Sequence, residues 1–565
     1  MSRIFIKPDL KINQWTDLEP YVNALLSASI TSEADFEAWL KRWNELCVVT
    51  SEDLAWRYIH MTCDTTHEEH KKSYLDFVQY IQPSLTEATN ALNQKMYHSG
   101  YAETFNEAGF ALLRKQIETE LQLFRPENIA LQTTLQDLEQ AYSTRCGAQT
   151  VQYNSKTLTL QQASVFLKDN NSEIRKSVYE LIQKRRAEDE EFFNQTLSKM
   201  IDLRHQMAVN AGCLNYRDYK HRALNRFDYT VTDCFTFHAA IEQVAVPLYR
   251  KKEHLRRQKM KSTAYMPWDV SVDVDGLPPL KPFKDGSALL DKTIACFNAI
   301  DPFFGECLST MKSMGRLDLE SRIGKAPGGY QYPLYESKVP FIFMNAVGLH
   351  RDLVTMVHEG GHALHSFLYK DLNKMAYQSP PSEIAELASM GMELISMEHW
   401  SVFFNSDTDL KRAKSQQLEG VLDTLPWIAA IDAFQHALYE HPTHDHAFRS
   451  ELWLNLMNRF GNTEVDYSNH QNDLARKWQA QLHIFEVPFY YIEYGIAQMG
   501  AIALWRNYKQ NPKQTITAYK TALSLGYTQS LPELYKAAGI RFEFTASYMQ
   551  ELMDFVWQEY VALQA

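Results

Sequence analysis

A glutamate between two histidines is the feature of this sequence best suited to chemistry. His358, Glu359 and His362 form an HExxH motif inside residues 350–368, HRDLVTMVHEGGHALHSFL. Side chains four residues apart lie one above the other on a helix, so the two imidazoles can reach one Zn²⁺ at about 2.0–2.1 Å. Glu359 projects beside them and can accept a proton from zinc-bound water, whose pKa the metal lowers to about 7. The motif predicts a hydrolytic zinc site in which Glu359 is the general base.

An HExxH pattern also occurs by chance on surface helices that carry two histidines. Two features of this helix favour the metal site. One is its apolar side, which consists of Leu353, Val357, Leu364 and Leu368. The other is the pair Gly360 and Gly361, each of which costs a helix interior about 1 kcal/mol relative to alanine. We expect another element to pack closely against these glycines, because a plain surface helix would gain nothing from them.

A carboxylate on the following helix is the predicted third ligand. That helical pattern carries Glu383, Glu386 and Glu393 on one face. A solvated acidic stripe is the alternative, but a carboxylate is the usual third ligand of a two-histidine catalytic zinc site. We assign Glu386 as the ligand and Glu393 as the acceptor that orients a ligating imidazole. His365 lies seven residues beyond His358, roughly 10 Å along the helix, which is too far to share the metal.

A histidine and three tyrosines form a second candidate group. Residues 483–494, HIFEVPFYYIEY, contain His483, Tyr490, Tyr491 and Tyr494. Peptide hydrolysis places negative charge on the scissile carbonyl oxygen, and one neutral phenol or imidazole donor can stabilise it by about 3–4 kcal/mol. Tyr491 and Tyr494 are three residues apart and share a helix face. Because the chain has 30 tyrosines, ordinary packing is the alternative that this group alone leaves open.

The elements that must position these residues are predicted to be mainly helices. The chain has 21 glycines and 20 prolines in 565 residues, which favours long helices over a many-turned β fold. We predict a helix over 31–45, a helical hairpin over 103–145 that is broken at Pro126, and a short β-hairpin over 151–160. The HExxH helix is expected at about 349–368.

A loop-rich stretch is expected at about 262–345, ahead of the HExxH helix, because prolines and glycines punctuate it. Its part from 324 to 345 is the best candidate for β structure. We expect two domains, an N-terminal helical lobe over 1–195 and a catalytic zinc domain over 196–565.

Composition narrows the classes of partner. The 57 basic and 69 acidic residues give a net charge of −12, which disfavours non-specific binding to nucleic acid or to an anionic membrane. The seven cysteines include no CxxC pair and are odd in number, which favours a reducing compartment. No segment resembles a signal peptide or a membrane span. We expect a cytoplasmic protein.

Together these segments resemble the oligoendopeptidase F group of the thimet oligopeptidase family of zinc peptidases. HEGGHALHSF at 358–367 is similar to the family's zinc helix, and EIAELASMGME at 383–393 to the next helix, whose ligand glutamate falls on Glu386. KAPGGYQYPLYESKVPFIFMN at 325–345 resembles the family's loop and edge strand. HIFEVPFYYIEYGIAQMGAIALW at 483–505 resembles its histidine and tyrosine segment.

The resemblance implies a mainly α, two-lobed helical body with a deep substrate channel and one Zn²⁺ per chain. It implies cleavage of short peptides. Residues 484–489 contain no glycine, unlike the glycine-rich loop of the thimet branch. Tyr491 and Tyr494 fit the family tyrosines best, and Tyr490 is a further candidate for contact with substrate.

The β segment before the zinc helix is the expected substrate site. Residues 339–345, VPFIFMN, are β-like, and an exposed strand edge is a template for an extended peptide. We therefore expect substrate to pair with this segment and to contact Phe341 and Phe343.

Two other functions stay open on the sequence alone. A metallocarboxypeptidase or peptidyl-dipeptidase would need a fixed cation for the substrate's terminal carboxylate, and Arg351 and Lys325 are the nearest in sequence. A catalytically silent zinc-binding scaffold is the second alternative. Glu359 speaks against it, because structural zinc needs no base between its histidines.

Overall fold

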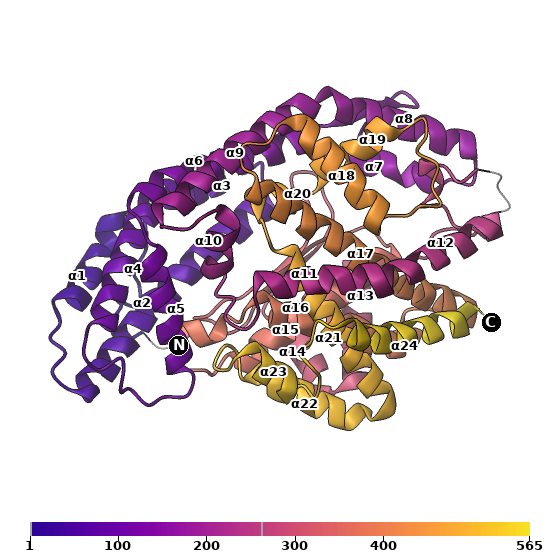
Figure 1. Ribbon diagram of the computed structural model, residues 1–565. Helices are drawn as coiled ribbons and strands as arrows, with labels where there is room; N and C mark the ends of the chain where they lie inside the picture. Colours follow the sequence, from indigo (N-terminus) through magenta and orange to yellow (C-terminus); the bar gives the residue numbers. More distant parts are fainter. Residues whose placement is uncertain (1–2, 261–263, 565) are drawn as a thin grey trace. The chain divides into compact units, whose positions relative to one another are not determined.

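The computed structural model describes residues 3–260 and 264–564, and most of them lie in helices (Figure 1). The predicted mainly α class is confirmed, as is a small β element ahead of the HExxH helix. No described helix combines the length and apolar character that crossing a membrane requires. The predicted substrate channel stays a prediction.

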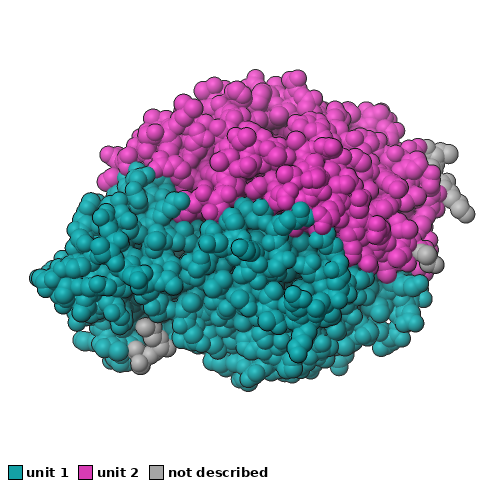
Figure 2. Space-filling model, turned by 60° about the horizontal axis from the view of Figure 1, so that its bottom comes forward, with its two compact units in different colours: residues 1–124, 280–414, 497–542 teal, residues 125–279, 415–496, 543–565 magenta. Residues whose placement is uncertain are grey.

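The chain divides into two compact units, each built from three separate segments (Figure 2). Unit 1 comprises residues 1–124, 280–414 and 497–542, and unit 2 comprises residues 125–279, 415–496 and 543–565. The predicted domain division at residues 195 and 196 falls inside one helix, α9 (Glu190–Asn210). That division stays a prediction.

Unit 1 holds the helices that carry the HExxH motif and its neighbours. Its helices are α1 (Glu19–Ser27), α2 (Glu33–Cys63), α3 (Glu68–Asp76), α4 (Gln82–Tyr97), α5 (Phe110–Leu123), α13 (Gly286–Ile300), α14 (Pro302–Ser313), α15 (His350–Tyr369), α16 (Ser382–Ser396), α22 (Pro512–Ser524) and α23 (Leu531–Ala537). The predicted helix at 31–45 is the first part of α2.

Unit 2 holds the segment with His483 and the tyrosines. Its helices are α6 (Glu127–Gly147), α7 (Leu160–Ser164), α8 (Ser172–Glu188), α9, α10 (Tyr216–Ala223), α11 (Val231–Ala240), α12 (Val246–Met260), α18 (His446–Phe460), α19 (Gln471–Ala475), α20 (Leu482–Glu486) and α24 (Ala546–Gln564). The unit boundaries at 414/415 and 496/497 fall within α17 (Asp407–Glu440) and α21 (Tyr491–Gln510).

The β-hairpin predicted at 151–160 is confirmed. Strands β1 (Thr150–Tyr153) and β2 (Lys156–Thr159) pair in antiparallel fashion. Asn154 and Ser155 form the turn with φ angles of 49° and 61°. Two central residues with positive φ define the turn that best matches the twist of a two-residue hairpin.

A three-stranded sheet precedes the HExxH helix, and its strand order corrects one prediction. The order is β3 (Leu317–Glu320), β5 (Phe341–Ala346), β4 (Tyr330–Tyr332), so β5 lies in the centre. It pairs in parallel with β3 and antiparallel with β4. The expectation that substrate adds to an exposed edge of residues 339–345 is therefore wrong, because partners already occupy both sides of β5.

Part of the predicted loop-rich stretch is helical. The prolines cluster at 267–282, and only a single short 3₁₀ turn interrupts the irregular chain there. Beyond them, α13 and α14 fill most of residues 286–313. The Asp285 carboxylate accepts a hydrogen bond from Ala288 N at 2.8 Å and caps α13, and Asp301 accepts from Phe303 N at 2.9 Å and caps α14. These caps mark helix starts that the surrounding prolines obscured.

Helix α15 begins where an aspartate satisfies the backbone ahead of it. The Asp352 carboxylate accepts hydrogen bonds from Val347 N at 2.8 Å and Leu349 N at 2.9 Å. A carboxylate in the first turn is also favoured by the helix dipole. The observed start at His350 agrees with the predicted helix at about 349–368.

Candidate metal site

Three side chains from α15 and α16 converge on one point in unit 1. One ligand atom each from His358, His362 and Glu386 lies within 4.8 Å of the others. Glu386 Oε2 is 3.5 Å from His358 Nε2 and 3.7 Å from His362 Nε2. Two imidazoles and one carboxylate are the donor set of many catalytic zinc sites, and nitrogen and oxygen ligands bind Zn²⁺ at about 2.0–2.2 Å. The residues present therefore fit a zinc ion.

Glu393 fixes the orientation of His358. Its Oε1 lies 2.7 Å from His358 Nδ1. With Nδ1 donating to this carboxylate, Nε2 faces Glu386 with its lone pair. Burial opposes protonation of His358, but the hydrogen bond to Glu393 and the nearby carboxylates raise its pKa to about 10. Such a concentration of negative charge around an imidazole is what a bound cation would neutralise.

Glu359 lies outside the ligand group and is enclosed. Glu359 is only 6% exposed. Burial raises the pKa of this carboxyl to about 7, and a backbone hydrogen bond from Gln331 opposes that rise. A carboxylate with a pKa near neutrality can both accept and return a proton. Gln331 belongs to β4, so the edge strand of the sheet lies beside Glu359.

Both glycines of the motif are sites of close approach, as expected. A Cβ on Gly361 would lie 2.6 Å from the Ala388 carbonyl oxygen and 2.6 Å from Ser389 Cα, which belong to the backbone of α16. A Cβ on Gly360 would lie 2.8 Å from the ring of Phe297 in α13. The absence of a side chain at Gly361 thus allows α16 to bring Glu386 to the histidines.

Ser389 is a neighbour of the ligand that sequence reasoning missed. Its hydroxyl lies 3.1 Å from Glu386 Oε2 and 3.0 Å from the Glu386 carbonyl oxygen. The signal was present, because a residue three positions after Glu386 shares its helix face. A hydrogen bond to a ligating carboxylate holds its orientation.

Several nearby polar residues do not belong to the metal site. His365 is buried among other groups of unit 1, and burial lowers its pKa to about 3. The side chain of Lys325 is buried, and its Nζ lies 2.8 Å from Asp318 Oδ1. It is therefore already engaged and is a poor candidate for a substrate carboxylate.

Phe341 and Phe343 are core residues of unit 1. They are 6% and 0% exposed, and they belong to one buried apolar cluster with residues of α2. The Phe343 ring stacks on Tyr330 with centroids 4.8 Å apart. Their assignment as substrate contacts therefore needs correction, since their side chains are used in packing.

His483 and the three tyrosines gather in unit 2. The His483 ring centroid lies 4.8 Å from that of Tyr491, 6.0 Å from Tyr494 and 6.1 Å from Tyr490. Burial raises the pKa of Tyr491, so its phenol is a neutral donor. The four predicted residues are therefore close together, and the metal ligands belong to the other unit.

The start of α21 is held by buried polar groups. Phe489 has φ of 67°, an uncommon value for a residue with a side chain. Its N–H donates to Gln435 Oε1 at 3.0 Å, and its carbonyl accepts from the Arg226 guanidinium. Arg226 also contacts Glu493 Oε1 at 2.6 Å. These contacts fix the backbone from which Tyr490 and the following tyrosine project.

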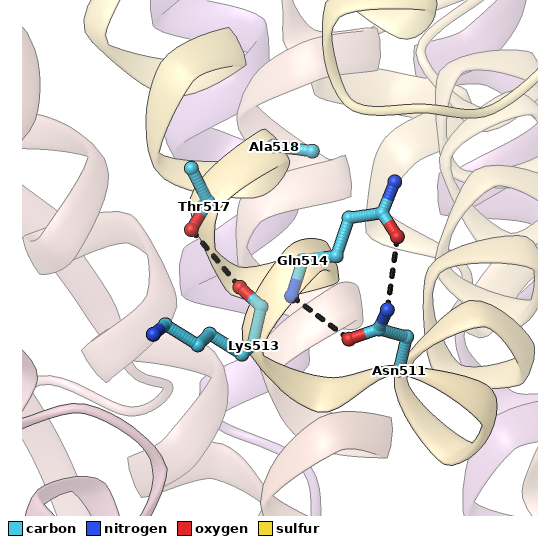
Figure 3. A pocket seen from close by; sticks show the side chains of 5 residues that line it. All are labelled: Asn511, Lys513, Gln514, Thr517 and Ala518. Atoms are coloured by element: carbon cyan, nitrogen blue, oxygen red, sulfur yellow. Dashed lines mark hydrogen bonds between the residues drawn. The ribbon is translucent and has the colours of Figure 1, made fainter.

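A surface hollow at the start of α22 has no part in this chemistry. Figure 3 shows its lining residues, Asn511, Lys513, Gln514, Thr517 and Ala518. Asn511 Oδ1 accepts from Gln514 N at 3.3 Å, and Asn511 Nδ2 donates to Gln514 Oε1 at 3.0 Å. These contacts cap a helix, and none of the five residues belongs to the predicted site.

Comparison with known proteins assigns most of the chain to one family. Residues 165–280 and 303–554 match Peptidase family M3, and residues 7–124 match the Peptidase M3 N-terminal domain. Oligoendopeptidase F (chromosomal) of Lactococcus lactis subsp. cremoris is 21% identical over 382 residues, which are 67% of this chain and 62% of that protein. An oligoendopeptidase F homolog of Lactococcus lactis subsp. lactis is 22% identical over 391 residues, which are 69% of this chain and 63% of that protein.

The fold is shared with a solved peptidase structure. The structure of PZ peptidase A with an inhibitor superposes with a TM-score of 0.92 at 23% identity, covering 99% of each chain. The chain spans somewhat less than two thirds of the two Lactococcus relatives, at 62% and 63% of their lengths. The resemblance to the oligoendopeptidase F group is confirmed. From these matches along most of its length, the chain belongs to peptidase family M3.

Proposed function

We propose that the protein is a zinc-dependent endopeptidase that hydrolyses short peptides in the cytoplasm. The observation that carries the proposal is the convergence of His358, His362 and Glu386, with the enclosed carboxylate of Glu359 beside them. Membership in peptidase family M3 supports it, as do relatives named oligoendopeptidase F.

Each residue has a distinct role in this proposal. His358, His362 and Glu386 hold one Zn²⁺, which when bound acidifies water and polarises a carbonyl oxygen. Glu359 accepts a proton from the attacking water and returns it to the amine that leaves. Glu393 holds His358 through Nδ1, so that Nε2 keeps its lone pair for the metal.

His483 and the tyrosines are proposed to stabilise the negative charge that develops on the carbonyl oxygen of the peptide. As the peptide carbonyl becomes tetrahedral, its oxygen gains negative charge. Phenols at Tyr491 and Tyr494 and the imidazole of His483 donate hydrogen bonds to that oxygen, and Tyr490 contacts the peptide. A donor that meets the charge only as it develops lowers the barrier without tightening substrate binding.

Strand β4 replaces β5 as the proposed site of peptide pairing. It is the edge strand on one side of the sheet, and Gln331 within it contacts Glu359. A peptide added along β4 would run past the proposed general base. A product complex with peptide main chain away from residues 330–332 would contradict this pairing.

The decisive experiment combines metal analysis with peptide cleavage. Purified protein should contain zinc and cleave a quenched fluorescent peptide, and a chelator should abolish cleavage until zinc is restored. Blocking both ends of the peptide tests the class of enzyme, because an endopeptidase still cuts it whereas a carboxypeptidase or peptidyl-dipeptidase does not. A zinc-loaded protein that cuts neither peptide would support the silent scaffold instead.

A further inference from the structure

Four potential metal ligands meet in unit 2, apart from the residues of the proposed peptidase site. Cys234 and His238 lie on α11, and Asp432 and His436 lie on α17, two helices that can be followed in Figure 1. Each pair is four residues apart, so its members share one helix face. All four are buried, with exposed fractions of 1%, 5%, 0% and 3% in that order.

Their distances suit a single small cation. One ligand atom each from Cys234, Asp432 and His436 lies within 4.8 Å of the others. Asp432 Oδ2 is 2.8 Å from His238 Nε2 and 3.2 Å from His436 Nε2. Ligand atoms about 2.0–2.3 Å from a tetrahedral zinc lie roughly 3.2–3.8 Å from one another. Small shifts of these side chains would therefore bring their ligand atoms to bonding distance from one ion.

Two polar atoms of the group lack a hydrogen-bond partner. Asp432 Oδ1 and His436 Nδ1 are buried and have no hydrogen-bond partner among residues 3–260 and 264–564. A buried carboxylate oxygen without a partner is costly, and a bound cation would supply that partner.

We propose that Cys234, Asp432 and His436 bind a divalent metal ion, and that His238 orients Asp432 by holding Oδ2. Sulfur, nitrogen and oxygen donors together favour Zn²⁺ over Mg²⁺ or Ca²⁺, which prefer all-oxygen sites. The four side chains are buried, and the one carboxylate among them, Asp432, is used as a ligand. The role of the site is structural, and it clamps α11 to α17.

The proposed metal site also contacts the segment that carries the tyrosines. The His436 ring lies against Phe489 with centroids 5.3 Å apart, and the adjacent Gln435 accepts from Phe489 N. A metal that fixes this turn of α17 would also steady Phe489, which precedes Tyr490 and Tyr491.

Metal counting tests the proposal on the full chain. After growth with zinc and exhaustive dialysis, wild-type protein should contain about two zinc ions per chain by mass spectrometry. The variants His362→Ala and Cys234→Ser should each contain about one. Cys307→Ser, which removes a thiol buried elsewhere, should keep both. One zinc ion in the wild type and an equal count in Cys234→Ser would overturn the proposal.

Cobalt spectroscopy separates this site from the peptidase site. His358, His362 and Glu386 supply no sulfur, so a thiolate-to-cobalt charge-transfer band in the near ultraviolet reports on Cys234. The band should appear in wild-type and His362→Ala proteins and vanish in Cys234→Ser. Its absence from the wild type would overturn the proposal even if a variant failed to fold. A band in a chain that cleaves no peptide would reject the proposed function and support this second site.

Discussion

In the proposed reaction Glu359 takes a proton from the attacking water but does not bind the metal. Its effect on catalysis can therefore be measured separately from zinc binding. We expect Glu359→Gln to keep its zinc and to lose about 10²–10⁴-fold in kcat, because the amide cannot accept the proton. Metal content and peptide cleavage measured on the same sample check this. An unchanged kcat in a zinc-loaded variant would remove Glu359 from the mechanism.

The two glutamates of α16 that face the histidines should fail in different ways. Glu386→Gln should abolish stable zinc binding, since an amide is a weak ligand. Glu393→Gln should weaken zinc affinity about 10–100-fold, because His358 loses the carboxylate that orients it. Competition with a zinc-binding dye measures both affinities. Glu383→Gln, a buried carboxylate one turn away on α16, is the matched control and should bind zinc normally.

The tyrosines are tested by removing single hydroxyl groups. Tyr491→Phe should lower kcat by about 10²–10³ with little change in KM, as for the loss of one oxyanion donor. Tyr494→Phe should give a similar or a smaller loss. Tyr265→Phe removes a buried hydroxyl elsewhere in unit 2, where it donates to Glu253 at 2.7 Å, and should leave kcat within about twofold. Equal behaviour of all three variants would make the tyrosines packing residues.

Helices α15 and α16 depend on glycine for their contact. Gly361→Ala should destabilise the protein by about 1–3 kcal/mol, because its Cβ would overlap the α16 backbone. Zinc affinity should fall as well, since Glu386 is carried by the displaced helix. Thermal unfolding with and without zinc measures both effects.

Gly420 provides the matched control within α17. A Cβ there meets nothing within 4 Å, and alanine is the better helix former. Gly420→Ala should therefore stabilise by about 0.5–1 kcal/mol. A Gly361→Ala protein as stable as this control would show that the helices can move apart at no cost.

Local patterns predicted the helices at 31–45 and about 349–368 and the hairpin at 151–160, but not the partners of each strand. The caps and periodicity around α15 and the Asn154-Ser155 turn are encoded within a few residues of the element they form. By contrast, the residues paired with β5 lie 9 to 13 positions away on β4 and 25 or 26 positions away on β3. Nothing in VPFIFMN says that both sides of this strand are paired. Apolar residues at every position, rather than alternate ones, were a sign of a strand buried on both faces.

At the scale of the whole molecule, a site could be predicted only where its residues lie close together in the sequence. His358, His362 and Glu386 lie on consecutive helices, so a motif and the next amphipathic stripe were enough. Cys234 and Asp432 are brought together by helices far apart in sequence, and each looks unremarkable alone. The i, i+4 pairs were visible, but only the fold shows that they face each other.

Removal of the zinc held by His358, His362 and Glu386 should abolish peptide cleavage without unfolding the protein. The side chains of His358 and His362 are 23% and 17% exposed, so a chelator can reach them. Helices α15 and α16 stay packed through apolar residues such as Leu364 and Leu387, both 0% exposed. Peptide cleavage should vanish, the far-ultraviolet circular dichroism should stay, and added zinc should restore cleavage. Full activity after verified depletion would contradict a zinc mechanism.

The contact at Gly361 also limits how this protein can change over generations. Every other amino acid adds at least a Cβ at that position, so no mutation offers a gentle intermediate between the present spacing of α15 and α16 and a wider one. Ala363, equally buried on α15, already carries a Cβ and can exchange size with its neighbours. Lineages descended from this sequence should therefore repack around position 363 long before they alter position 361, and random mutagenesis under selection for cleavage should recover glycine alone there.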